Sequence, residues 1–208
     1  TTLLLFTGLS VALAFRAGIF NIGTQGQMVV GGLATALLVL WASSLVSGLI
    51  GTVVLIPFGV AVGAVFGGLY GAIPGLLKAY ADANEVITTI MLNFIATGVT
   101  LYLVSGAFKD PESPANQTVP LPEYAQFPTV LFGGRQDFSL VALAFGVLAI
   151  GGLYYLLEHT AFGYDIRTSG LQPDAAEYGG VAAKRTVVAS LTLSGAFGGV
   201  AGAMYVMM

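Results

Sequence analysis

Polar side chains that can bond to a solute lie inside apolar stretches at two places in the chain. The first is segment 17–27, AGIFNIGTQGQ, and the second is a row of polar residues four apart within 85–105, which puts them on one helix face. Polar groups at membrane depth are costly and usually face a bundle interior or a cavity. Since amides and hydroxyls exchange hydrogen bonds with sugar or ribose hydroxyls, we expect a path for a neutral polar solute. The seven residues of this predicted path are Asn21, Gln25, Gln27, Glu85, Thr89, Asn93 and Thr97.

Both places also have a purely structural interpretation. Gln27 lies three residues after Thr24, which is the spacing of a capping box that opens a helix, and Glu85 follows Asp82 at the same spacing. The threonines of the second row can bond to carbonyls of their own helix. Asn93 is the deepest of the amides, whereas Glu85 is expected near the cytosolic edge, as a cap or a gate rather than a solute ligand.

A polar stretch, 158–185, separates two long apolar runs and holds a large share of the few charges. Within it, 172–180 reads QPDAAEYGG and predicts a short helix. Pro173 suits the first helical position, and Asp174 is favourable near the positive end of the helix dipole. The glycine pair that follows supplies a left-handed end. A short helix between two membrane spans has no core of its own, so we expect it to dock onto another surface.

Composition points to a membrane protein and excludes several kinds of site. Of the 208 residues, 56% are hydrophobic and 8% are charged, whereas a soluble domain carries about 25% charged residues. The absence of cysteine rules out disulfides and thiolate metal sites, and the single histidine, His159, excludes a multi-histidine metal site. A net charge of −3 gives no reason to expect a nucleic-acid partner. No lysine stands in a GxxxxGK[ST] phosphate-binding loop, so this chain is not expected to bind ATP.

The apolar runs predict an all-α polytopic membrane protein with about six membrane segments. A span needs about 20 residues, and the first run, 1–15, falls short of that; the chain starts inside one apolar run and stops inside another. We therefore expect 1–208 to be a single, partial transmembrane domain. The proline-rich stretch 106–137 is expected outside the membrane. The predicted segments are 3–15, 28–45, 46–78, 85–105, 138–157 and 186–208.

Positive charges predict the orientation of these segments, because loops on the cytoplasmic side carry an excess of lysine and arginine. Alternating the spans puts five basic residues on the side of stretch 158–185 and two on the other side. Stretch 158–185 is therefore expected to be a cytoplasmic loop, and 106–137 an extracytoplasmic one. The richer side holds Arg16, Lys78, Arg167, Lys184 and Arg185; the other holds Lys109 and Arg135.

Small residues recur four apart in two of the predicted spans. This spacing lays a groove of bare backbone along one helix face, where another helix can approach closely. Both rows are expected to serve helix packing. Their members are Gly59, Gly63, Gly67, Gly71 and Gly75 in the first row, and Ser190, Ser194, Gly198 and Gly202 in the second.

Three separated motifs in this order resemble the inner-membrane permeases of ABC importers: FRAGIFNIGTQGQM at 15–28, NEVITTIMLN at 84–93 and FGYDIRTSGLQPDAAEYGGV at 162–181. The resemblance is greatest to permeases of simple-sugar and nucleoside uptake, which are related to the ribose and branched-chain amino-acid permeases. It implies a type II bundle like that of the vitamin B12 importer and a multi-pass protein of the cell membrane. It also implies ATPase subunits that carry ATP and Mg, a second permease copy or a sister permease, and an extracytoplasmic solute-binding protein. This chain would bind no cofactor itself.

The same resemblance assigns a role to the short helix of the cytoplasmic loop. Residues 174–180 are similar to the coupling motif Glu-Ala-Ala-x-x-x-Gly, with Asp174 in place of the glutamate. In such importers this helix contacts the ATPase. Its small alanines would let it lie close in a groove of the partner. The residues expected to couple the permease to its ATPase are Gly170, Pro173, Asp174, Ala175, Ala176, Gly179 and Gly180.

Other functions remain open at this point. An ion-coupled secondary transporter or channel would need titratable groups at mid-membrane, and only Glu85 comes close. A branched-chain amino-acid ABC permease is a second alternative, although a path for a charged solute would be expected to show a buried counter-charge. An intramembrane enzyme is disfavoured, because His159 lies at the cytosolic border and no metal-ligand cluster or carboxylate pair falls within a predicted span.

Overall fold

The computed structural model describes residues 2–128 and 139–208, and within them all regular secondary structure is helical. The predicted all-α class is therefore confirmed. Residues 129–137 of the predicted outer loop, with Arg135, lie outside the described residues, as do Thr1 and Phe138. The helices are α1 (Thr2–Arg16), α2 (Thr24–Ser43), α3 (Gly48–Ala81), α4 (Glu85–Ser105), α5 (Leu140–His159), α6 (Ala161–Leu171), α7 (Pro173–Tyr178) and α8 (Ala183–Met207), with a 3₁₀ turn, η1 (Glu123–Ala125).

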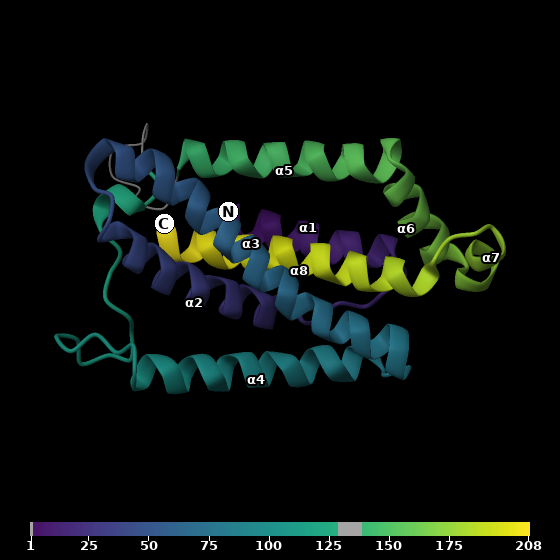
Figure 1. Cartoon of the computed structure of the whole chain (residues 1–208), viewed down its shortest axis with the longest axis horizontal. Coiled ribbons are helices and arrows are strands. Elements are labelled where there is room, and N and C mark those ends of the chain that lie inside the picture. Colours follow the sequence, from purple (N-terminus) through teal and green to yellow (C-terminus); the bar gives the residue numbers. More distant parts are fainter. Residues whose placement is uncertain (1, 129–138) are drawn as a thin grey trace.

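Five of these helices, α2, α3, α4, α5 and α8, are long and apolar enough to cross a membrane. Helix α1 is also apolar but has only 15 residues, fewer than the roughly 20 that a bilayer requires. The ends of α1, α3 and α5 and the starts of α4 and α8 gather at the end of the bundle that carries α6 and α7 (Figure 1). The chain is thus a multi-pass membrane protein.

Helix α8 forms the centre of the bundle. It is the most buried of the five candidate spans, and α4 is the least buried. Helices α1, α2 and α3 pack around α8, while α4 and α5 lie on opposite outer sides (Figure 1). The side chains of Leu191, Met204 and Met207 on α8 are fully buried. Groups placed on α8 can therefore contact three neighbouring helices at once.

The glycine row of α3 lies against α8. A Cβ atom added to Gly67 would lie 2.5 Å from the carbonyl oxygen of Gly195, and one added to Gly63 would lie 2.6 Å from that of Gly199. Contacts this short leave no room for a side chain, so the two backbones touch. The ends of the row, Gly59 and Gly75, lie against side chain and backbone atoms of α8 respectively. In the second row, Gly198 and Gly202 of α8 face α2.

Gly67→Ala tests whether this backbone contact holds the bundle together. Alanine favours a helix over glycine by up to about 1 kcal/mol, but here its methyl group would overlap backbone atoms of Gly195 and Gly199. We expect a net loss of about 1–3 kcal/mol in the free energy of unfolding, as is usual for overpacking. Gly98→Ala is the matched control, because nothing lies within 4 Å of a Cβ at Gly98 on α4. Equal thermal stability of the two variants in detergent would contradict the prediction.

The described part of the predicted outer loop covers the end of the bundle opposite α6 and α7, where α2 and α8 end (Figure 1). Its Leu121, Ala125 and Phe127 side chains are buried in the core cluster that also holds Met207. The backbone N–H of Phe127 donates to the Met207 carbonyl oxygen at 2.8 Å, and the Tyr124 hydroxyl donates to the Ser43 carbonyl oxygen at 3.2 Å. These buried side chains and the two hydrogen bonds thus hold this part of the loop on the helix ends.

Candidate functional site

The candidate site begins at the segment between α1 and α2, residues 17–23. Helix α1 ends in a tight turn in which the N–H of Ile19 donates to the Ala14 carbonyl oxygen, and Gly18 has φ of +70°, a conformation that favours glycine. The chain then runs back into the bundle, and α2 begins well inside it (Figure 1). Non-helical backbone at membrane depth is tolerated where protein or a water-filled cavity surrounds it. The segment therefore needs polar partners, and the bundle supplies them.

Asn21 is the central residue of these contacts. Its side-chain Nδ2 donates to Ser194 Oγ of α8 at 2.8 Å and to Gln27 Oε1 of α2 at 3.2 Å, while its Oδ1 accepts the backbone N–H of Gly23 at 2.9 Å. Asn21 is 3% exposed and Gln27 is 1% exposed. The amide groups are thus fully desolvated, and their hydrogen bonds hold the segment and α2 against α8.

The hydroxyl groups of Ser10 on α1 and Thr24 on α2 complete the arrangement. Ser10 Oγ of α1 lies 3.0 Å from Ser194 Oγ and 3.1 Å from Thr24 Oγ1, and Ser194 Oγ donates to the Ser10 carbonyl oxygen at 2.7 Å. We call this set the polar cluster: Ser10, Asn21, Thr24, Gln27 and Ser194. It joins α1, α2, α8 and the segment between them, and it contains no charged side chain.

Asn93 of α4 hydrogen-bonds to the same segment and to the start of α2. Its Nδ2 donates to the Ile22 carbonyl oxygen at 2.9 Å, and its Oδ1 accepts the N–H of Gly26 at 2.7 Å. The first N–H groups of a helix have no partner within it, so Asn93 caps α2 from a neighbouring helix. A Cβ at Gly26 would lie 2.8 Å from this oxygen, which shows why a residue without a side chain stands there.

The remaining residues of the predicted path are placed differently. Gln25 is exposed on the first turn of α2. Thr89 and Thr97 donate to the carbonyl oxygens of Glu85 and Asn93, four residues earlier in their own helix. The carboxylate of Glu85 pairs with Lys78 Nζ at 2.8 Å, at the end of the bundle where α3 stops and α4 starts. The structure thus brings Asn21, Gln27 and Asn93 together at the start of α2, and the buried Thr89 packs against Gly23 beside them. Gln25, Glu85 and Thr97 lie outside this place.

Both predicted capping boxes are wrong. Helix α2 has Gly23 at its N-cap without a side-chain bond, because the amide of Gln27 is used by Asn21. At the start of α4 the cap is Asn84, whose Oδ1 accepts the N–H groups of Val86 and Ile87. Asp82 instead ends α3 in a left-handed conformation, with φ of 49°.

The predicted short helix of the polar stretch is confirmed as α7. Pro173 stands at its start, and Gly180 follows its end with φ of +87°, whereas Gly179 keeps a negative φ. Ala176 is buried toward a pocket of about 240 Å³ between α6 and α7. Tyr178 points away from the protein and is 95% exposed. An exposed aromatic ring on an end of the bundle outside the spans is suited to contact with another protein.

Helix α6 was not predicted from the sequence. Thr160 caps it by accepting the N–H of Gly163 at 3.0 Å, and Ile166 is fully buried among apolar residues of α1, α5 and α8. At its end, Gly170 packs directly on the turn that follows α1. A Cβ at Gly18 would lie 2.7 Å from the Gly170 carbonyl oxygen, and one at Gly170 would overlap the Arg16 carbonyl oxygen. Helix α6 therefore touches, backbone to backbone, the segment that leads to Asn21.

Comparison with known families identifies the kind of protein. A family model described as "Branched-chain amino acid transport system / permease component" matches residues 1–208. The chain belongs to this permease family. The match extends over the segment 17–23, the polar cluster, Asn93 and the α6–α7 loop.

Curated relatives of this permease have different named solutes. The chain is 35% identical to the nucleoside ABC transporter permease protein NupB of Lactococcus lactis, over 97% of the chain and 56% of that relative. It is 34% identical to the guanosine ABC transporter permease protein NupP of Bacillus subtilis, over 96% and 56%. It is 30% identical to the glucose ABC transporter permease protein TsgB13 of Haloferax volcanii, over 96% and 53%. The chain spans about half the length of these relatives, and no solved structure matches it.

Proposed function

We propose that this chain forms part of the translocation path of an ABC importer for a neutral polar solute, with nucleosides as the first class to test. The observation that carries the proposal is that the polar side chains at bundle depth, Asn21, Gln27, Asn93 and Ser194, are all uncharged in a chain of this family. In the structure they bond to one another and to backbone groups, and so they shape the break before α2. Transporters with broken helices bind their solutes near such half-helix starts, and the absence of a charged side chain here favours a neutral solute. The named solutes of the relatives, nucleoside, guanosine and glucose, support the same class.

The distribution of charge favours this function over an ion-coupled transporter. In each of the five candidate spans, all of which are fully described, every charged side chain lies in the first or last turn. An ion-coupled mechanism needs titratable or ion-binding side chains near the midplane. The same distribution offers no counter-charge to an amino-acid substrate. Transport of a neutral solute with an external energy source explains the absence of charge from the middle of these spans better than either alternative does.

The energy source in this proposal is a separate ATPase, which holds ATP and Mg and docks on α7. Five of the six lysine and arginine residues that the structure describes lie at the end that carries α6 and α7, as expected of a cytosolic face. They are Arg16, Lys78, Arg167, Lys184 and Arg185. We assign stretch 158–185 to the cytosol, with Gly170, Pro173, Asp174, Ala175, Ala176, Gly179 and Gly180 in or beside the docking helix. The remaining proposed partners are a second permease copy or a sister permease and, outside the membrane, a solute-binding protein that delivers to the 106–137 side. The arrangement proposed for 1–208 is a type II permease domain.

The function is tested by reconstituting the natural permease with its ATPase and binding protein in lipid vesicles. Uptake of labelled guanosine, uridine or glucose is expected to require ATP and all the subunits. Uptake driven by an ion gradient without nucleotide would overturn the proposal and favour the secondary-transporter alternative. Uptake of leucine, but of none of these three solutes, would favour the amino-acid alternative instead.

Tyr178→Ala tests the docking surface separately. Exposed tyrosines often dominate the binding energy of an interface, and truncating one commonly costs about 1–2 kcal/mol, or about tenfold in affinity. We expect the purified permease to bind its ATPase about tenfold more weakly, as measured by biolayer interferometry. Tyr102→Ala is the control, because Tyr102 is 78% exposed but lies near the far end of α4. Equal affinity in both variants would remove α7 from the interface.

A further inference from the structure

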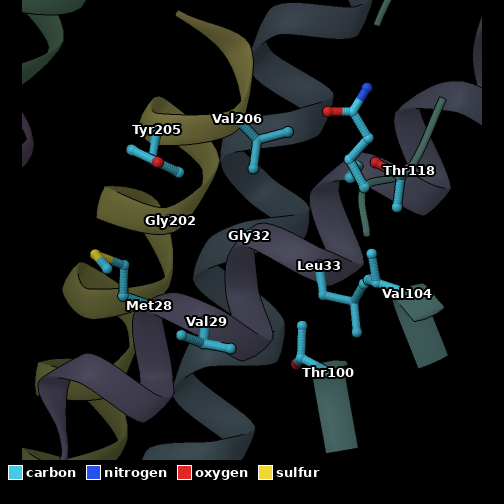
Figure 2. Close-up of a pocket in the computed structure, with 12 residues that line it drawn as sticks. Met28, Val29, Gly32, Leu33, Thr100, Val104, Thr118, Gly202, Tyr205 and Val206 are labelled. Atoms are coloured by element: carbon cyan, nitrogen blue, oxygen red, sulfur yellow. The ribbon is translucent and has the colours of Figure 1, made fainter. Parts of the chain in front are cut away.

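A pocket of about 290 Å³ opens between α2, α4 and α8. It lies toward the ends of α4 and α8, at the end of the bundle opposite α7 (Figure 1). Leu33 of α2 and Val104 of α4 lie toward each other across it, and Thr118 of the outer loop lies beyond them (Figure 2). Val29 and Val206 add further apolar wall. A volume near 300 Å³ is at the lower end of the range for small-molecule sites.

Polar groups stand at only a few points of this pocket. Thr100 of α4 lies on one side, Gln117 and Thr118 lie at the outer edge, and Tyr205 of α8 stands at the margin, 73% exposed. The outer edge is held in place, because the N–H of Asp110 donates to the Gln117 carbonyl oxygen at 2.8 Å. Apolar walls with a few convergent polar groups are typical of sites for flat, partly polar molecules.

The pocket continues the row of polar residues on α4. Asn93, Thr97, Thr100 and Val104 are spaced four, three and four apart, so they share one face of this helix. Asn93 bonds to the start of α2, and Thr100 enters the pocket seven residues later, about 10 Å further along the helix. The pocket thus lies at the outer end of the same seam between α2 and α4 whose inner end carries the candidate site.

We infer that this pocket receives the heterocyclic base of a nucleoside as the solute enters from outside. The inference rests on the proposed function and names its substrate class. A base has two flat apolar faces, which Val29, Leu33 and Val104 can cover, and a polar edge within reach of Thr100 and the outer-loop residues. A monosaccharide carries a hydroxyl on almost every carbon, and several would be buried against valine and leucine without partners, which is costly. The pocket therefore selects nucleosides over glucose.

Val104→Trp fills the pocket without touching the polar cluster. In the reconstituted natural importer, KM for labelled guanosine or uridine is expected to rise about tenfold or more, because the base no longer fits. ATPase docking should be unchanged, since Val104 lies at the opposite end of α4 from the docking side. The matched control is Val99→Trp, on the same helix but not lining the pocket and 52% exposed. Its KM should stay within about twofold of the original value.

Thr100→Val is a smaller change that keeps the test informative if tryptophan disturbs folding. It preserves shape and removes one hydrogen-bonding hydroxyl, so KM for the nucleoside is expected to rise about fivefold at unchanged Vmax.

An unchanged nucleoside KM in both pocket variants would overturn the inference. So would transport of glucose but not of nucleosides by the unmodified importer. An equal loss of Vmax for every solute that is reversed by a different lipid composition would instead identify the pocket as an acyl-chain site. Absence of any ATP-dependent uptake by the unmodified importer would overturn the proposed function itself.

Discussion

Gly170→Ala is expected to reduce solute uptake by about 10-fold to 100-fold while ATP hydrolysis by the assembled importer continues. The reason is the backbone contact between the end of α6 and the turn after α1. Gly18 needs its left-handed conformation, and a methyl group on Gly170 would overlap the Arg16 carbonyl oxygen. The added carbon must push α6 away from the segment that carries Asn21.

The contact matters because it lies on a short structural route from α7 to the polar cluster. Gln172 alone separates α7 from α6, and Ile166 of α6 packs in one core cluster with Ala17 and Ile19 of the segment. Two residues beyond Ile19, Asn21 bonds to Ser194. In the proposed importer, a displacement of α7 by the ATPase would move α6 and the segment as a packed unit. A methyl group on Gly170 would separate α6 from the segment and so uncouple ATP hydrolysis from transport.

Uptake and hydrolysis are measured in the same vesicles, so that the ratio of solute moved to ATP hydrolysed separates uncoupling from misfolding. A folding defect lowers both rates together, whereas uncoupling lowers only uptake. Gly151→Ala on α5 is the matched control, because no atom lies within 4 Å of a Cβ there. A normal ratio in Gly170→Ala would show that the contact carries no displacement.

Much of the framework could be predicted from local sequence. Apolar runs of about 20 residues identify the spans, and Pro173 with Gly180 marks α7, since both signals act within one turn of the chain. Helix α6 was not predicted, because the contacts that stabilise it are made with other helices and not within its own sequence. Glycines at 163 and 170 argue against a helix, yet both stand where another backbone approaches too closely for a side chain.

The candidate site was only partly predictable for the same reason. Amides in apolar sequence indicated Asn21, Gln27 and Asn93, but the contacts that tie Asn21 to α8 and Asn93 to α2 join residues remote in the chain. Ser10 and Ser194 are 184 residues apart, and no local pattern connects them. The predicted capping boxes are wrong because a spacing of three residues does not show which partner a side chain takes. Gln27 bonds to Asn21, six residues before it, instead of capping α2.

Asn21→Leu is expected to have the second large effect, on stability and transport together. Leucine removes the donor to Ser194 and Gln27 and the acceptor for the Gly23 N–H. A buried polar group left unpaired costs about 1–3 kcal/mol, and more than one is left here. We therefore expect a lower thermal midpoint in detergent and uptake reduced by about tenfold or more. Gln25→Leu, at an exposed amide on the first turn of α2, should leave the thermal midpoint unchanged.

A double-mutant cycle with Gln27→Leu separates the polar cluster from a general effect of apolar substitution. Once Asn21 is leucine, Gln27 has already lost its bond to it, so the second substitution should cost less than it does alone. The expected interaction is about 0.5–3 kcal/mol, the range for residues in one hydrogen-bond network. Strict additivity of the two losses in stability would mean that the amides act independently. The segment 17–23 would then be held by Asn93 and the backbone contact with Gly170.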